Sequence, residues 1–138
     1  MLPRVFVSGV GVVSSIGLGK KEFYRSLSLG KSGISPIESF DATNLGRHFA
    51  GEVKAFRTRD HLSAAENRRM GRCGAMTLAA ARMAVEDAGM DPAILRGPRT
   101  AVVLGTTMGE ATLFADLDAS WIHDGADAVK SALIPKYG

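Results

Sequence analysis

The fold class follows from one apolar run near the start of the chain, Val5-Phe6-Val7-Ser8-Gly9-Val10-Gly11-Val12-Val13. Its β-branched and small side chains do not alternate with polar ones, which is typical of a strand buried on both faces. Strands of this kind belong to parallel sheets that are covered by helices. The run therefore predicts a buried strand over residues 5–13 in an α/β fold.

Helical and strand-like segments alternate after this run. Helical spacing and helix end signals predict helices over residues 20–29, 64–88 and 111–122. Shorter apolar stretches predict strands over residues 48–53 and 100–104. Strands that alternate with helices argue for a parallel sheet. We expect one domain over residues 1–138 with no internal boundary.

The segment from residue 64 to residue 88 is the clearest helix. Ser63 and Glu66 form a capping box at its start, and Gly89 is a stop signal at its end. Small side chains recur along one side of this helix: Cys73, Gly74, Thr77, Ala80, Ala81, Ala84 and Ala88. Such a stripe predicts that the helix approaches another backbone closely.

The composition is that of a globular domain, with 46% hydrophobic and 22% charged residues and a net charge of +3. No apolar run approaches a membrane span, and the start lacks the features of a signal peptide, so we expect a cytoplasmic protein. Aromatic residues make up only 7%, which argues against nucleic-acid binding. The single cysteine, Cys73, excludes an internal disulfide framework and a multi-cysteine metal site.

Two motifs allow more than one interpretation. The stretch from Gly9 to Ser14 is similar to a dinucleotide-binding fingerprint, in which glycines let the backbone approach a pyrophosphate. Its glycines fall inside the apolar run, which favours close packing instead. Cys73 is placed mid-helix on the small-residue side with no assigned base, so a structural cysteine is favoured over a nucleophile.

The turn Gly105-Thr106-Thr107-Met108-Gly109 follows the last predicted strand. Ligands of open α/β sheets gather beyond the carboxyl ends of the strands. Met108 offers a flexible apolar surface that suits a chain-like substrate. A plain glycine turn with a core methionine is the alternative.

Taken together, these segments resemble the N-terminal part of a β-ketoacyl–acyl-carrier-protein synthase, an elongating condensing enzyme of the thiolase superfamily. The matching stretches lie in the same order along the chain, at residues 5–17, 30–34, 40–41, 49–53, 68–70, 84–89 and 105–109. The resemblance implies a partial, incomplete thiolase-like fold, the N-terminal half of that α/β fold.

The resemblance also implies an activity for a longer protein. In the family a cysteine takes up an acyl group, malonyl-carrier protein loses carbon dioxide, and the resulting carbanion attacks the thioester, with support from two histidines. The nucleophile and both histidines match positions after residue 138, and Cys73 does not align with the nucleophile. No catalytic residue is therefore assigned here, and we expect a fragment that is inactive alone.

Four residues match family positions with a role. Met108, with Thr107 beside it, corresponds to the lining of the acyl-chain pocket, although relatives commonly have glycine where Glu110 stands. Arg68 and Arg69 correspond to a basic spot that meets the acyl carrier protein. The implied partners are this carrier, acyl and malonyl thioesters, and a second subunit in a homodimer or heterodimer. No cofactor, metal, nucleic acid or membrane is implied.

Two other functions stay open. The first is a non-catalytic partner similar to a chain-length factor, in which another residue replaces the nucleophile. The second is a dinucleotide-binding domain built on Gly9 and Gly11.

Overall fold

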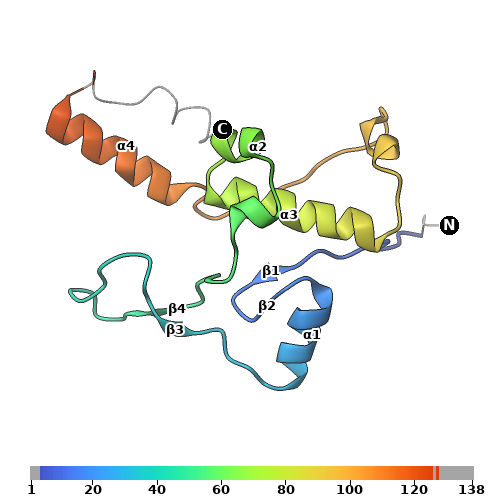
Figure 1. The fold of residues 1–138 in the computed structure, drawn as a ribbon, viewed down its shortest axis with the longest axis horizontal. Coiled ribbons are helices and arrows are strands. Elements are labelled where there is room, and N and C mark those ends of the chain that lie inside the picture. The colour runs from blue at the N-terminus through green and yellow to red at the C-terminus, as the bar shows by residue number, and fades with distance from the viewer. Residues whose placement is uncertain (1–3, 126, 128–138) are drawn as a thin grey trace. The chain divides into compact units, whose positions relative to one another are not determined.

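The computed structural model describes residues 4–125 and 127. The helical elements are α1 (Lys20–Ser28), η1 (Thr58–Asp60), α2 (Ala64–Arg69), α3 (Arg72–Asp87), η2 (Pro92–Arg96) and α4 (Ala111–Asp124) (Figure 1). The strands are β1 (Val13–Ser14), β2 (Gly17–Leu18), β3 (Ser35–Pro36) and β4 (Phe49–Ala50). They form two antiparallel pairs, β1 with β2 and β3 with β4. The contacts of the chain gather in two units, residues 1–56 with 79–95, and residues 57–78 with 96–138.

Close backbone packing against the second half of α3 holds the first unit together. A side chain at Gly11 would overlap the carbonyl oxygen of Ala80, and its Cβ would lie 2.8 Å from the nitrogen of Ala84. A Cβ at Gly9 would lie 2.7 Å from the nitrogen of Ala88. The predicted close approach of the small-residue side of this helix is therefore confirmed. The dinucleotide interpretation is wrong, because the helix backbone fills the space that a pyrophosphate needs beside these glycines.

Polar contacts fasten the same end of α3. The carboxylate of Asp87 accepts a hydrogen bond from the backbone N–H of Val10 at 3.0 Å and forms an ion pair with Lys20. These contacts tie the last residue of α3 to the apolar run and to the first residue of α1. Hydrogen bonding by Lys20, then by the Val10 N–H, lowers the pKa of Asp87.

The second unit is built on a capped helix. The Ser63 hydroxyl accepts from the Glu66 N–H at 3.3 Å, and Glu66 Oε2 accepts from the Ser63 N–H at 2.9 Å. The predicted capping box is therefore confirmed. In this unit Leu62 and Ala75 are buried, with 7% and 1% of their surface exposed.

The helix expected over residues 64–88 is two helices. Met70 takes an extended conformation (φ −124°, ψ 144°), so α2 ends at Arg69 and α3 begins at Arg72. Gly71 lies at the break, and glycine weakens a helix interior. The other end was predicted correctly, because Gly89 follows α3 with φ +61°. The helices expected near residues 20–29 and 111–122 are confirmed as α1 and α4.

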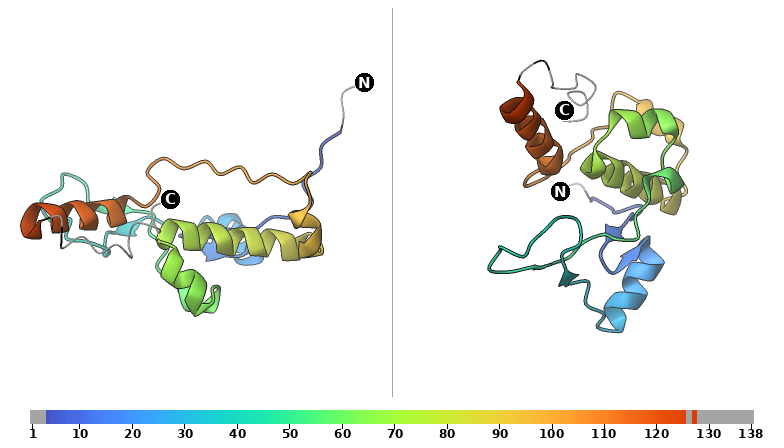
Figure 2. Two further views of the ribbon diagram at one scale, coloured as in Figure 1. Left: turned by 90° about the horizontal axis from the view of Figure 1, so that it is seen from above. Right: turned by 60° about the vertical axis from the view of Figure 1, so that its left-hand side comes forward.

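Most of the predicted strand residues are not in strands. Only Val13 of the run over residues 5–13 belongs to a strand, and residues 100–104 form none. Figure 2 shows residues 101–105 within an extended segment that leads to α4. Val5, Val7, Val102 and Val103 are 83–94% exposed. A strand needs a neighbouring strand for its backbone N–H and C=O groups, and apart from Val13 these runs have no partner strand within the described residues.

The third expected strand, over residues 48–53, is reduced to β4, which pairs with β3. None of the helices within residues 4–125 and 127 is both long and apolar enough to cross a membrane.

Candidate functional site

The turn before α4 is held by a hydrogen bond between its own backbone and a threonine side chain, and it presents an apolar side chain. The N–H of Gly109 donates to Thr106 Oγ1 at 2.9 Å, and Gly109 has a φ of +54°, which favours glycine. Thr107 is exposed, and Met108 is 73% exposed. The residues predicted to line an acyl pocket therefore lie together on a turn whose shape is locally fixed.

Glu110 follows this turn and joins two helices. Its carbonyl accepts the Phe114 N–H at 3.1 Å, which begins α4. Its side-chain Oε1 accepts the Gly74 N–H at 2.7 Å, in the first turn of α3. The first N–H groups of a helix have no partner within the helix, and a carboxylate there also interacts favourably with the helix dipole. Glu110 therefore caps α3 from 36 residues away.

Gly71 makes room for this cap. Its carbonyl accepts the Ala75 N–H at 3.0 Å, so Gly71 occupies the N-cap position of α3. It has no side chain with which to cap the helix itself. A Cβ at Gly71 would lie 2.6 Å from Glu110 Oε1 and would overlap the rest of the carboxylate. The remote cap therefore depends on glycine at this position.

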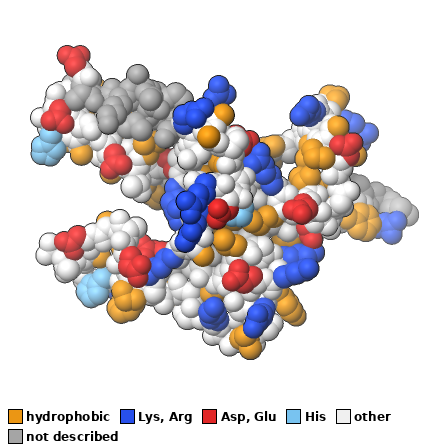
Figure 3. Space-filling model, viewed as in Figure 1, with side chains coloured by type: hydrophobic (Ala, Val, Ile, Leu, Met, Phe, Trp, Pro, Cys, Tyr) orange, Lys and Arg blue, Asp and Glu red, His pale blue; other side chains and the backbone are white. Residues whose placement is uncertain are grey.

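The predicted docking residues Arg68 and Arg69 are the last two residues of α2, and both are exposed. Figure 3 shows Lys and Arg side chains gathered over the segment that contains η1 and α2. Two basic side chains at a helix C-terminus complement the helix dipole. The arginine pair is thus available to an acidic partner.

The bond from Glu110 to Gly74 joins the two predicted sites. Gly71 lies two residues after Arg69, and Glu110 lies two residues after Met108. Sequence reasoning found the arginine pair and the turn but missed the role of Glu110, because no local pattern marks a contact across 36 residues. Gly71 inside a helical pattern was the available signal for a break.

The predicted position of Cys73 within its helix was wrong. It is the second residue of α3, not a mid-helix residue as the sequence predicted, and it is half-buried. Within the described part of the chain, no group of three or more His, Cys, Asp or Glu side chains could hold a metal ion.

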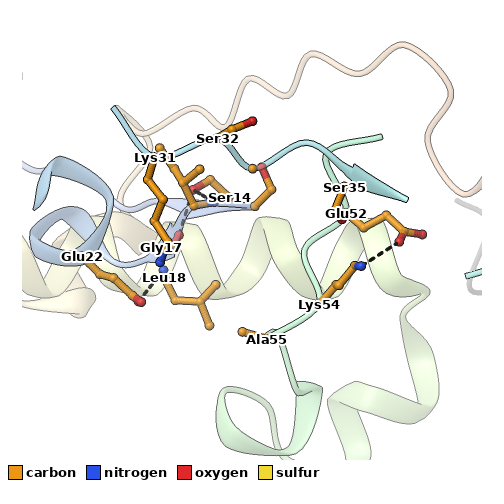
Figure 4. Close-up of a pocket in the computed structure, with 13 residues that line it drawn as sticks. Ser14, Gly17, Leu18, Glu22, Lys31, Ser32, Ser35, Glu52, Lys54 and Ala55 are labelled. Carbon is orange, nitrogen blue, oxygen red and sulfur yellow. Dashed lines mark hydrogen bonds and ion pairs between the residues drawn. The ribbon is translucent and has the colours of Figure 1, made fainter. Parts of the chain in front are cut away.

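A separate cavity of about 280 Å³ lies in the first unit, near β1 and β2 (Figure 4). Two carboxylates line this cavity, and both accept hydrogen bonds from backbone N–H groups. Glu22 Oε2 accepts from the Leu18 N–H at 3.0 Å, and Glu52 accepts from the N–H groups of Glu38 and Ser39. Hydrogen bonds from Ser39 and from Glu38 lower the pKa of Glu52. Lys54 lies 3.9 Å from Glu52 Oε2 and 2.6 Å from Glu38 Oε1. These groups hold loops in place.

Comparison with known proteins assigns the family. Residues 3–135 match the model of the β-ketoacyl synthase N-terminal domain. The chain belongs to this family. It is 30% identical over 137 residues to 3-oxoacyl-(acyl-carrier-protein) synthase I, chloroplastic, of Hordeum vulgare, a match that covers 96% of this chain and 30% of the relative. It is 32% identical over 132 residues to 3-oxoacyl-(acyl-carrier-protein) synthase 2 of Vibrio cholerae, covering 96% and 32%.

A solved structure supports the same assignment. The ishigamide ketosynthase/chain length factor matches with a TM-score of 0.86 and 35% identity, over 96% of this chain and 33% of that one. The fold is therefore the thiolase-like α/β fold of the β-ketoacyl synthase N-terminal domain. The chain spans about a third of the length of the relatives that it matches.

Proposed function

We propose that this chain is the carrier-docking and acyl-contacting part of a β-ketoacyl-acyl-carrier-protein synthase. The longer protein joins an acyl thioester to malonyl-carrier protein by decarboxylative Claisen condensation, in fatty-acid or polyketide-type synthesis. The observation that carries this proposal is the family match over residues 3–135. We assign the protein to the cytoplasm.

In this reaction the acyl group is held as a thioester on a cysteine of the longer protein. Malonyl-carrier protein releases carbon dioxide, and the carbanion that remains attacks the thioester carbonyl and displaces the cysteine thiolate. We assign none of these steps to a side chain of the 138-residue chain. The chain alone is inactive in condensation.

Arg68 and Arg69 bind the acyl carrier protein, an acidic partner. Both side chains are exposed at the end of α2, so their charges attract acidic groups through solvent. Charge attraction of this kind weakens as salt is added. Met108 and Thr107 contact the acyl chain that the carrier delivers, since Met108 combines an apolar, adaptable side chain with 73% exposure.

The docking assignment predicts the result of a double charge reversal. Arg68→Glu with Arg69→Glu should weaken binding of an acyl carrier protein at least about ten-fold at low salt, with a smaller effect at high salt. Fluorescence anisotropy of a labelled carrier measures the affinity. The control is Lys21→Glu with Arg25→Glu, which reverses the same number of charges on exposed positions of α1. Equal affinity of the Arg68 and Arg69 variant and the unchanged chain at low salt would remove these residues from the docking site.

One observation favours the alternative of a non-catalytic partner: a solved structure that the chain matches is a ketosynthase/chain length factor. In that case the longer protein pairs with a catalytic subunit in a heterodimer, whereas the condensing enzyme forms a homodimer. Sequencing the gene past the codon for Gly138 separates the two. A cysteine at a strand-to-helix turn followed by two histidines supports the enzyme, and another residue at that turn supports the partner.

A further inference from the structure

We propose that Glu110 is a positioning residue that couples the docking arginines to the acyl-contacting turn. The roles of the two ends rest on the proposed function, whereas the link between them rests on the contacts of Glu110 alone. Binding of a carrier at Arg68 and Arg69 and placement of Met108 are, on this view, one linked event.

The link is a single residue that begins one helix and caps another. The Glu110 backbone carbonyl starts α4 through the Phe114 N–H, and its side chain takes the Gly74 N–H of α3 at 2.7 Å. A displaced carboxylate would leave the Gly74 N–H without this partner. The start of α4 and the start of α3 therefore move together or lose a charge-assisted hydrogen bond.

Both connections from Glu110 to the predicted sites are short and constrained. On one side, Gly109 and the hydrogen bond from its N–H to Thr106 Oγ1 fix the path from Met108. On the other side, only Met70, in an extended conformation, and Gly71 separate Arg69 from α3. A shift at the end of α2 therefore reaches the turn through few flexible bonds.

Hydrogen exchange of the full chain tests the link without any carrier. Gly71→Ala introduces a Cβ that overlaps the Glu110 carboxylate, 39 positions along the chain. We expect Gly71→Ala and Glu110→Ala each to accelerate amide exchange of residues 105–109 at least about five-fold. Combining the two substitutions should add little, because each removes the same contact.

Gly74→Ala is the matched control in the same helix turn. Its Cβ would lie 3.6 Å from Glu110 Oε1, an ordinary contact, so the cap stays in place. We expect residues 105–109 of this variant to exchange as in the unchanged chain. Unchanged exchange of residues 105–109 in Gly71→Ala would overturn the link.

Carrier binding tests what the link does. We expect the chain to bind a carrier protein that bears an octanoyl group more tightly than the same carrier without it. Glu110→Ala should reduce this acyl-dependent gain at least about five-fold, while the affinity for the unacylated carrier changes less than about two-fold. Glu110→Gln should restore part of the gain, because its amide oxygen can accept the Gly74 N–H.

The outcomes separate the two proposals. A full acyl-dependent gain in Glu110→Ala would overturn the coupling and leave the proposed function intact. No carrier binding by the unchanged chain would overturn the proposed function and with it the functional role of Glu110. The exchange experiment would then still decide whether the link between residues 71–74 and Glu110 exists.

Discussion

The two ends of α3 are held by different kinds of contact. At the C-terminal end, Gly9 and Gly11 lie against the helix backbone, and Asp87 adds hydrogen bonds and an ion pair. At the N-terminal end, one remote carboxylate, that of Glu110, caps the first turn. The C-terminal end depends on close packing of backbones, so an added side-chain atom would overlap the helix. The N-terminal end depends on one hydrogen bond, and a substitution can remove this bond without causing a steric overlap. The ends should therefore differ in how strongly single changes affect stability.

The largest effect is expected where the backbone fit is closest. Gly11→Ala places a Cβ against the Ala80 carbonyl and the Ala84 nitrogen, and neither backbone group can rotate away. Overpacking of this kind should lower the free energy of unfolding by about 3 kcal/mol. Urea unfolding followed by circular dichroism measures the loss.

Gly46→Ala is the control for this change. A Cβ at Gly46 meets nothing within 4 Å, and this glycine does not have a positive φ. Its stability should stay within about 0.5 kcal/mol of the unchanged chain. Equal stabilities of the Gly11 and Gly46 variants would mean that the segment around Gly11 is not tightly packed on α3.

The polar end should respond less strongly. Glu110→Ala removes the cap of the Gly74 N–H but introduces no overlap, so we expect a loss of about 1 kcal/mol. The same urea experiment measures it, with Glu86→Ala as the control, because Glu86 is an exposed glutamate of α3, the helix that Glu110 caps. A loss as large as that of Gly11→Ala would show that the two ends are held equally firmly.

This contrast also explains what the sequence could predict. Close packing was predicted separately for the small-residue side of this helix and for the glycines of the apolar run, because small residues at regular spacing mark both. That these two segments pack against each other was not predicted; the structure places Gly9 and Gly11 against Ala80, Ala84 and Ala88. The capping box at Ser63 was predicted because all its atoms lie within four residues. Local patterns therefore identified the closely packed segments and the capping box.

What the sequence did not predict depends on distant segments. Residues 5–12 and 100–104 have the composition of buried strands, but a strand forms only beside a partner. The candidate turn was found from its place after an expected strand and the arginine pair by resemblance, whereas their connection through Glu110 spans 36 residues and leaves no local pattern. The break at Gly71 was overlooked because apolar and small residues continue at helical spacing on both sides of it.

The smallest effect concerns the ion pair at the C-terminal end of α3. Folding lowers the pKa of Asp87 through hydrogen bonding by Lys20, then by the Val10 N–H. The stabilisation that the ionised Asp87 carboxylate provides is therefore complete above the unfolded pKa of about 3.9, and it is lost as the pH falls through the lower folded pKa. Asp87→Asn should be less stable than the unchanged chain near pH 7, and the difference should shrink toward about pH 3. Urea midpoints across this range measure it.

Lys20 provides the sharper version of this test, because its hydrogen bond is the largest cause of the lowered pKa. Lys20→Met should remove most of the pH dependence that Asp87→Asn also removes, whereas Lys21→Met, at the exposed neighbouring position of α1, should leave it unchanged. The Val10 N–H still supports the carboxylate in Lys20→Met, so a smaller pH-dependent contribution should persist. A Lys20→Met chain with the full pH dependence of the unchanged protein would show that backbone contact alone stabilises Asp87. Both ends of α3 would then depend on a carboxylate that accepts a backbone N–H, and the ion pair would add nothing to that contact.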